Sequence, residues 1–141
     1  MKKFLIIFIF IIFYTFDIKA ESIDDKFEYY KQNCYSQAYP SDEKDETYTL
    51  YNDKYKEATQ KYNFCIKEII SSKISQLFEP EYAAILLENL QKSEIFQLSF
   101  YDGIFNHEDN GTYGKLYGTE QVTGSLENML KSIILYQTNY R

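Results

Sequence analysis

The chain has 141 residues, of which 15 are basic and 21 acidic, so its formal net charge at pH 7 is −6. This length predicts one small domain with a modest hydrophobic core. The negative charge disfavours nucleic acid and anionic membrane surfaces as partners, whereas it speeds association with basic proteins at low salt.

The first 20 residues have the layout of a secretory signal peptide. The basic Met1–Lys3 precedes an unbroken apolar run, Phe4–Phe16, and Ala20 ends the segment. That run is shorter than the roughly 20 residues a membrane span needs. We therefore expect cleavage after Ala20, no stable membrane insertion afterwards, and a periplasmic or secreted domain comprising residues 21–141. The alternative is an uncleaved N-terminal anchor.

Cleavage would also change the charge of the protein. Removing residues 1–20 takes away three Lys and one Asp, which leaves 12 basic and 20 acidic residues and a net charge of −8. A basic protein is therefore the partner that long-range electrostatics favours most, although the same charge also serves solubility alone.

The first helix is expected to follow Ser22 and to end near Pro40. Ser22 is a suitable N-cap, and acidic Asp24 and Asp25 stand in the first turn. An apolar stripe recurs at helical spacing, formed by Ile23, Phe27, Tyr30, Cys34 and Ala38.

The longest periodic segment is Glu46–Phe78, which contains no Gly or Pro. Its apolar residues step by three and four, as expected for a helix that buries one face: Tyr51, Tyr55, Ala58, Tyr62, Cys65, Ile66, Ile69, Ile70, Ile74 and Leu77. The flanking segments carry matching stripes, so a helical bundle is predicted around this segment.

The two cysteines of the chain are Cys34 and Cys65, and an even pair in an exported protein predicts a disulfide. In a straight helical hairpin the two sulfur atoms would lie at different heights, because only Cys34 is close to the turn. Either residues 48–55 form a separate short helix or an extended loop, or the first helix docks near the middle of the second. We favour a break around Asn52.

The third helix is expected to begin at Glu79–Glu81 and to run to about Phe105. Pro80 suits the first helical position, and the carboxylates suit the positive end of the helix. Because this segment is apolar on more than one side, we expect it to be the most enclosed helix.

A long polar loop is expected over Asn106–Gly118, followed by a fourth helix that Thr119 caps. The predicted fold is therefore all-α, a small disulfide-linked bundle of about four helices. Its core is expected to contain Ile66, Ile70, Leu86, Leu90, Leu126 and Leu130.

No motif for catalysis or cofactor binding is found, because the sequence lacks a Gly-rich phosphate loop, a CxxC pair and a nucleophile elbow. The single histidine, His107, precedes Glu108 and Asp109, and three consecutive side chains cannot all face one metal ion. Glu79 and Glu81 could form a glycosidase pair, but helix capping explains them better. We expect no enzyme, no cofactor and no metal site.

Several short strings between residues 58 and 135 have a distinctive order and spacing: Thr59-Gln60-Lys61-Tyr62-Asn63-Phe64-Cys65, then Leu90, Glu94, Phe100 and Asp102, then Gly111-Thr112, then Thr123 and Leu130. They resemble the motifs of the lysozyme inhibitor LprI-like family of exported bacterial domains. The sequence departs from that family at three positions. Gln97 stands where the family has Trp, Tyr101 where it has Arg, and Phe105 where it has Cys. The resemblance implies a small, disulfide-linked, all-helical exported domain that binds lysozyme or another envelope-directed enzyme.

The leading hypothesis is an exported, inhibitor-like protein that acts by binding a basic protein such as lysozyme. The expected contact is the Asn106–Gly118 loop, with Glu108 and Asp109 facing the basic surface and Tyr113 as aromatic anchor. The same loop could be only a solvated connection. The alternative function is a non-enzymatic structural or envelope-maintenance protein with no lysozyme target.

Overall fold

The computed structural model describes residues 22–39, 53–105 and 112–140. Within these ranges the secondary structure consists of four helices: α2 (Ile23–Ala38), α3 (Asp53–Leu77), α4 (Pro80–Phe105) and α5 (Thr112–Tyr140). The predicted all-α fold is therefore confirmed. None of the described helices combines the length and the hydropathy that crossing a membrane requires.

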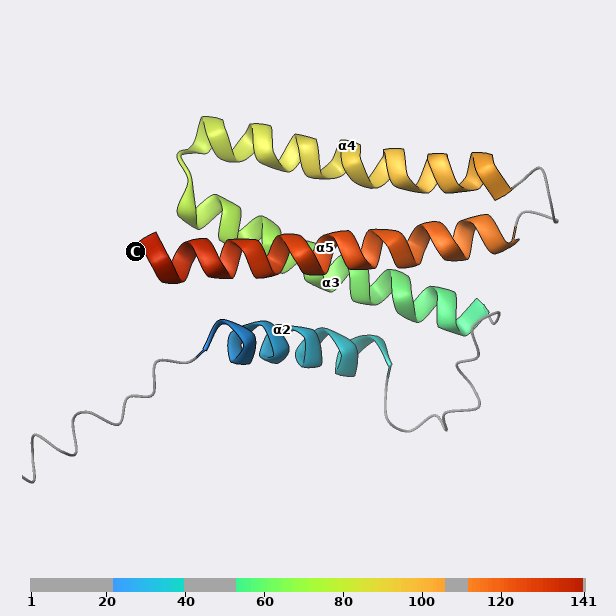
Figure 1. Ribbon diagram of the computed structural model, residues 1–141, viewed down its shortest axis with the longest axis horizontal. Helices are drawn as coiled ribbons and strands as arrows, with labels where there is room; N and C mark the ends of the chain where they lie inside the picture. The colour runs from blue at the N-terminus through green and yellow to red at the C-terminus, as the bar shows by residue number, and fades with distance from the viewer. Residues whose placement is uncertain (1–21, 40–52, 106–111, 141) are drawn as a thin grey trace, which may run out of the picture.

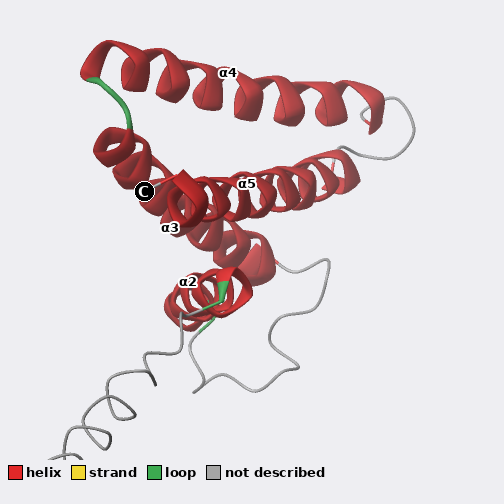
Figure 2. Cartoon of the chain, turned by 60° about the vertical axis from the view of Figure 1, so that its left-hand side comes forward, coloured by secondary structure: helices red, strands yellow, loops and turns green. Residues whose placement is uncertain are grey.

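α3 and α5 form the centre of the bundle and run in the same direction (Figure 1). Three of their hydrogen-bonded pairs stand 64 or 65 residues apart in the sequence: Tyr55 with Glu120, Tyr62 with Glu127, and Lys73 with Gln137. α2 and α4 run the opposite way and lie on opposite sides of this central pair (Figures 1 and 2). α5 consequently packs against all three other helices.

The starts of α2 and α4 agree with the local sequence signals. Ser22 caps α2 through a capping box, in which its Oγ accepts a hydrogen bond from the Asp25 N–H at 3.0 Å and the Asp25 carboxylate accepts one from the Ser22 N–H at 3.2 Å. α3 begins at Asp53, directly after the predicted break, and residues 40–52 lie outside the described chain. α4 begins at Pro80, where a missing N–H costs no helical hydrogen bond.

The predicted core is confirmed. All four helices contribute to one cluster of buried side chains, in which Ile66, Ile70 and Leu130 are fully buried. The remaining three predicted members are the buried Leu90 and Leu126 and the partly buried Leu86. Burial of these aliphatic side chains holds the four helices together.

The predicted disulfide between Cys34 and Cys65 is present, with Cα atoms 5.6 Å apart. The C-cap residue of α2, Tyr39, lies beside the first two turns of α3: its hydroxyl is 2.8 Å from Thr59 Oγ1, and its ring centroid is 6.3 Å from that of Tyr55. This placement brings the two cysteines to the same height. Docking of the first helix partway along the second therefore accounts for the mismatch seen in the sequence, whereas the favoured break around Asn52 lies outside the described residues.

The prediction that α4 is the most enclosed helix is wrong. Several of its large apolar side chains are between 47% and 67% exposed: Tyr82, Ile85, Ile95, Phe96, Phe100 and Ile104. α4 packs mainly against α5 and more lightly against α3, so one side of it faces away from the bundle (Figure 2). The apolar residues on the second side of α4 are therefore not buried and form an exposed apolar face.

The predicted loop is also too long, because α5 begins at Thr112 and Thr119 is a buried residue inside the helix rather than its cap. Gly118 was predicted to end the loop, but it lies inside α5. A Cβ atom at this position would lie 3.2 Å from Tyr101 Cβ and 3.7 Å from Leu98 Cα. Glycine here permits close approach of α5 to α4.

Gly124→Ala should increase the free energy of unfolding by about 0.5 to 1 kcal/mol, because glycine is unfavourable inside a helix. A Cβ at Gly124 would meet no atom within 4 Å. Gly118→Ala should lack this gain, since its methyl group would crowd Tyr101. Urea unfolding of both variants measures the difference, and an equal gain at the two positions would contradict the close packing at Gly118.

Candidate functional site

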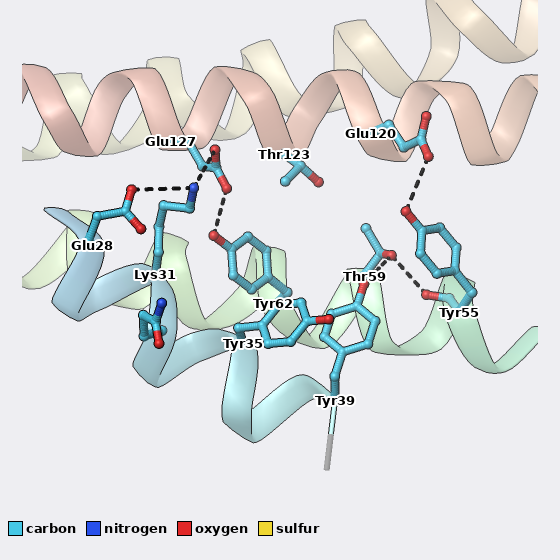
Figure 3. Close-up of a pocket in the computed structure, with 11 residues that line it drawn as sticks. Glu28, Lys31, Tyr35, Tyr39, Tyr55, Thr59, Tyr62, Glu120, Thr123 and Glu127 are labelled. Atoms are coloured by element: carbon cyan, nitrogen blue, oxygen red, sulfur yellow. Dashed lines mark hydrogen bonds and ion pairs between the residues drawn. The ribbon is translucent and has the colours of Figure 1, made fainter. Parts of the chain in front are cut away.

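A cleft of about 660 Å³ opens between α2, α3 and α5. Each helix contributes residues that share one face: Glu28, Lys31, Gln32, Tyr35 and Tyr39 from α2 and its C-cap, Tyr55, Thr59 and Tyr62 from α3, and Glu120, Thr123 and Glu127 from α5 (Figure 3). Four tyrosines and three glutamates thus dominate the lining, with one lysine. The cleft is both acidic and aromatic.

Two tyrosines of α3 hold two glutamates of α5 in place across the cleft. The Tyr62 hydroxyl donates to Glu127 Oε1 at 2.7 Å, and the Tyr55 hydroxyl donates to Glu120 Oε1 at 3.3 Å (Figure 3). Tyr62 is buried, so most of its ring belongs to the core while its hydroxyl reaches the carboxylate. These bonds fix the position of both negative charges on the cleft wall.

The hydroxyls of Tyr39, Tyr55 and Tyr62 remain protonated at neutral pH, because the pKa of each is raised above its ordinary value. Burial raises the pKa of Tyr62, and the hydrogen bond to the Glu127 carboxylate and its charge raise it further. Burial and the charge of Glu120 likewise raise the pKa of Tyr55, and burial raises the pKa of Tyr39. These groups therefore serve as hydrogen-bond donors and do not add negative charge to the cleft.

A stacked pair of rings, Tyr35 and Tyr39, forms the α2 wall, with centroids 4.5 Å apart and planes 20° from parallel. Thr59 Oγ1 donates to the Tyr55 carbonyl oxygen at 2.8 Å and so has no second proton to give. The Tyr39 hydroxyl is therefore the donor in its 2.8 Å contact with Thr59. The Tyr35 ring is exposed at the mouth of the cleft.

Lys31 neutralises only part of the acidic charge. Its Nζ lies 3.7 Å from Glu28 Oε1 and 3.9 Å from Glu127 Oε2, distances at which partly exposed ion pairs contribute little. Three glutamates and one lysine leave the lining with a net charge of −2. The carboxylates can therefore still attract a cation from outside.

Behind the cleft, buried Asn63 ties α3 to α5. Its side-chain amide donates to the Thr119 carbonyl oxygen at 3.2 Å, and Thr123 Oγ1 donates to Asn63 Oδ1 at 2.7 Å. Removing either partner would leave a buried polar group unsatisfied. This contact sets the height of α5, and therefore of Glu120 and Glu127, relative to the tyrosines of α3.

Comparison of the chain with protein-family models, curated proteins and solved structures finds no match. The resemblance to the lysozyme inhibitor LprI-like family thus stays a prediction. Two of its residues, Asn63 and Thr123, do meet in the hydrogen-bond network behind the cleft. The chemistry of the cleft is therefore the main structural evidence for a function.

The site predicted from the sequence is not tested by the structure. Glu108 and Asp109 lie outside the described residues, and Tyr113 lies in the first turn of α5, where its side chain is not described. Among the described residues there is no cluster of three or more potential metal ligands. The expected absence of a metal site stays a prediction.

Of the residues that line the cleft, Tyr55 and Tyr62 stood out in the sequence as parts of the apolar stripe of the second predicted helix, and the two threonines only as members of the family motifs. Tyr55 and Tyr62 stand seven residues apart, as do Glu120 and Glu127, which places each pair on one face of its helix. Such spacing is also typical of core aromatics and solvated carboxylates. What joins the two pairs is the register of α3 against α5, and no local pattern reveals it.

Proposed function

We propose that this chain is an exported binding protein for a basic protein, and that the cleft receives a lysine or arginine side chain of that partner. The observation that carries the proposal is the pair of carboxylates, Glu120 and Glu127, which tyrosine hydroxyls hold on the cleft wall. Lysozyme is the candidate partner that the family resemblance implies.

The chemistry of the lining suits a cationic side chain. A guanidinium or ammonium group gains charge-assisted hydrogen bonds from a carboxylate and is attracted to the face of a tyrosine ring. The Glu127 side chain is only 26% exposed, so an ion pair made there is less screened than one on the open surface. The exposed Tyr35 ring offers an aromatic face in the same cleft.

The disulfide supports export, because such bonds persist mainly in oxidising compartments. The overall negative charge supports a basic partner, since opposite net charges speed the diffusional encounter of two proteins. The cleft would then provide the specific contact that follows this encounter.

The double substitution Glu120→Gln/Glu127→Gln should weaken binding of a basic lysozyme by about tenfold or more, as expected for the loss of partly buried charge pairs. Glutamine keeps the size of the side chain and can still accept the tyrosine hydrogen bonds. Isothermal titration calorimetry at several salt concentrations measures the affinity, and the variant should show a weaker dependence on salt. The same lysozyme with its lysines succinylated should not bind the unmodified chain.

The control is Glu79→Gln/Glu81→Gln, which makes the same change in net charge at two exposed positions around the start of α4, in the connection to α3 and the first turn. It should change the affinity by less than about twofold. An equal loss in both double variants would show that only net charge matters and would remove the cleft from the proposal. If neither the unmodified chain nor any variant binds the basic lysozyme or inhibits it, the lysozyme proposal fails.

A further inference from the structure

The outward face of α4 has an apolar end, a charged middle and a second apolar end. Helical spacing places these residues in one row along the helix: Tyr82, Ile85, Glu88, Asn89, Lys92, Phe96 and Phe100. All seven are exposed. Exposed aromatic and aliphatic side chains that gather at both ends of one helix face indicate an interaction surface.

Aromatic contacts occupy both ends of this face. Near its C-terminal end Phe96 and Phe100 stack, with ring centroids 5.8 Å apart. Near its N-terminal end Tyr82 lies 6.2 Å from the Phe78 ring, which in turn stacks on Tyr136 of α5 at 5.7 Å. Each end therefore presents ring surface that its own bundle does not bury.

The middle of the face carries one opposite-charge pair. Glu88 Oε1 and Lys92 Nζ are 2.7 Å apart, and both side chains are more than 60% exposed. Each group retains unused hydrogen-bonding capacity toward solvent, because a carboxylate accepts several hydrogen bonds and an ammonium group donates three. A second helix with the reverse order of charges could share both groups.

Read in the opposite chain direction, this face keeps its order of apolar and charged positions, but the acidic and the basic position are exchanged. If a second copy of α4 lies antiparallel, with a twofold axis passing between positions 90 and 91, Ile85 stands opposite Phe96 of the other copy. Tyr82 then stands opposite Phe100, and Glu88 opposite Lys92, each within about one residue, or 1.5 Å, along the axis. Apolar ends therefore meet apolar ends, and each acidic group meets a basic one.

We propose that α4 forms a twofold-symmetric, antiparallel homodimer through this face. A symmetric dimer uses one surface patch on both copies, so that surface must be complementary to itself. The pattern on α4 fulfils this condition in both hydrophobicity and charge, and a different protein partner would not require it. The commitment to a second copy rests on this self-complementarity.

The dimer leaves the cleft open. α4 lies on the side of the α3–α5 pair opposite to α2, and α2 forms one wall of the cleft (Figure 2). Two copies joined through α4 would therefore carry two outward-facing clefts. Because a single helix pair is a small interface, we expect a dissociation constant in the micromolar range.

Sedimentation equilibrium tests the dimer on protein expressed from the full-length gene and purified after export. Between about 1 and 200 µM the mass should rise from that of one chain toward that of two, as a micromolar dissociation constant requires. Glu88→Lys and Lys92→Glu should each raise the dissociation constant about tenfold or more, since like charges then face each other. The double swap Glu88→Lys/Lys92→Glu should restore it to within about threefold, and the two single variants should dimerise when mixed.

The matched controls are the single variants Glu57→Lys and Lys61→Glu and their double swap, which make the same changes in an equally exposed pair on α3, 2.9 Å apart, away from the α4 face. They should leave the dissociation constant unchanged, and circular dichroism should show the same helix content in every variant. A single-chain mass at all concentrations overturns the proposal. A dimer whose dissociation constant is unchanged by Glu88→Lys also overturns it. The same holds for a monomer that binds phosphatidylcholine vesicles through Phe96 and Phe100.

Discussion

Replacing Cys34 and Cys65 together by alanine is expected to lower the free energy of unfolding by about 3 to 4 kcal/mol. The bond closes a loop with a sequence separation of 31 residues, and it restricts the unfolded chain accordingly. A small domain has a total stability of roughly 5 to 15 kcal/mol, so this loss would be a large share of it. The melting temperature should fall by roughly 10 to 20 °C.

Urea unfolding of the oxidised protein, the reduced protein and the double variant measures this effect. The reduced protein and the variant should have similar midpoints, because both lack the cross-link. Two thiols that react with a labelling reagent in the unfolded, unreduced protein would show that Cys34 and Cys65 are not paired. A difference below about 1 kcal/mol between oxidised and reduced protein would contradict the predicted constraint on the unfolded state.

Leu130→Ala is expected to lower the free energy of unfolding by about 2 to 5 kcal/mol, because it removes three carbon atoms from a packed interior and leaves a cavity. Leu130 is fully buried and belongs to the cluster that joins all four helices. The surrounding side chains come from rigid helices and can close this cavity only partly. Denaturant unfolding monitored by circular dichroism provides the measurement.

Leu135→Ala on the same helix is the control. It makes the same chemical change at a side chain that is 45% exposed. It should cost less than about 1 kcal/mol. Similar losses at the two positions would mean that α5 is rotated about its axis relative to the arrangement described here. The comparison separates the effect of burial from the effect of changing leucine to alanine in a helix.

Much of the fold could be predicted because it depends on local patterns. The stripe of α3 placed Ile66 and Ile70 in the core, Ser22 and Pro80 marked helix starts, and the cysteine count indicated the disulfide. Each of these features follows from helical spacing, from capping chemistry or from the only possible cysteine pair.

The remaining features depend on contacts between distant segments. Apolar residues around α4 indicate burial only if neighbours cover every side, and the bundle supplies neighbours on one side alone. Gly118 has the composition of a loop but serves close helix packing. Tyr62 was expected in the core and is buried there, yet its hydroxyl also reaches Glu127, which stands 65 residues away.

The central position of α5 affects how the chain can fold as it is synthesised. The ribosome makes α2, α3 and α4 first, but each of them buries apolar surface against α5, which follows in the sequence. A nascent chain that ends before Thr112 therefore lacks the partner its other helices need, and it should stay unfolded with α3 accessible to chaperones. For the export that we propose, such delayed folding would keep the chain in the extended state that passage through a narrow membrane channel requires.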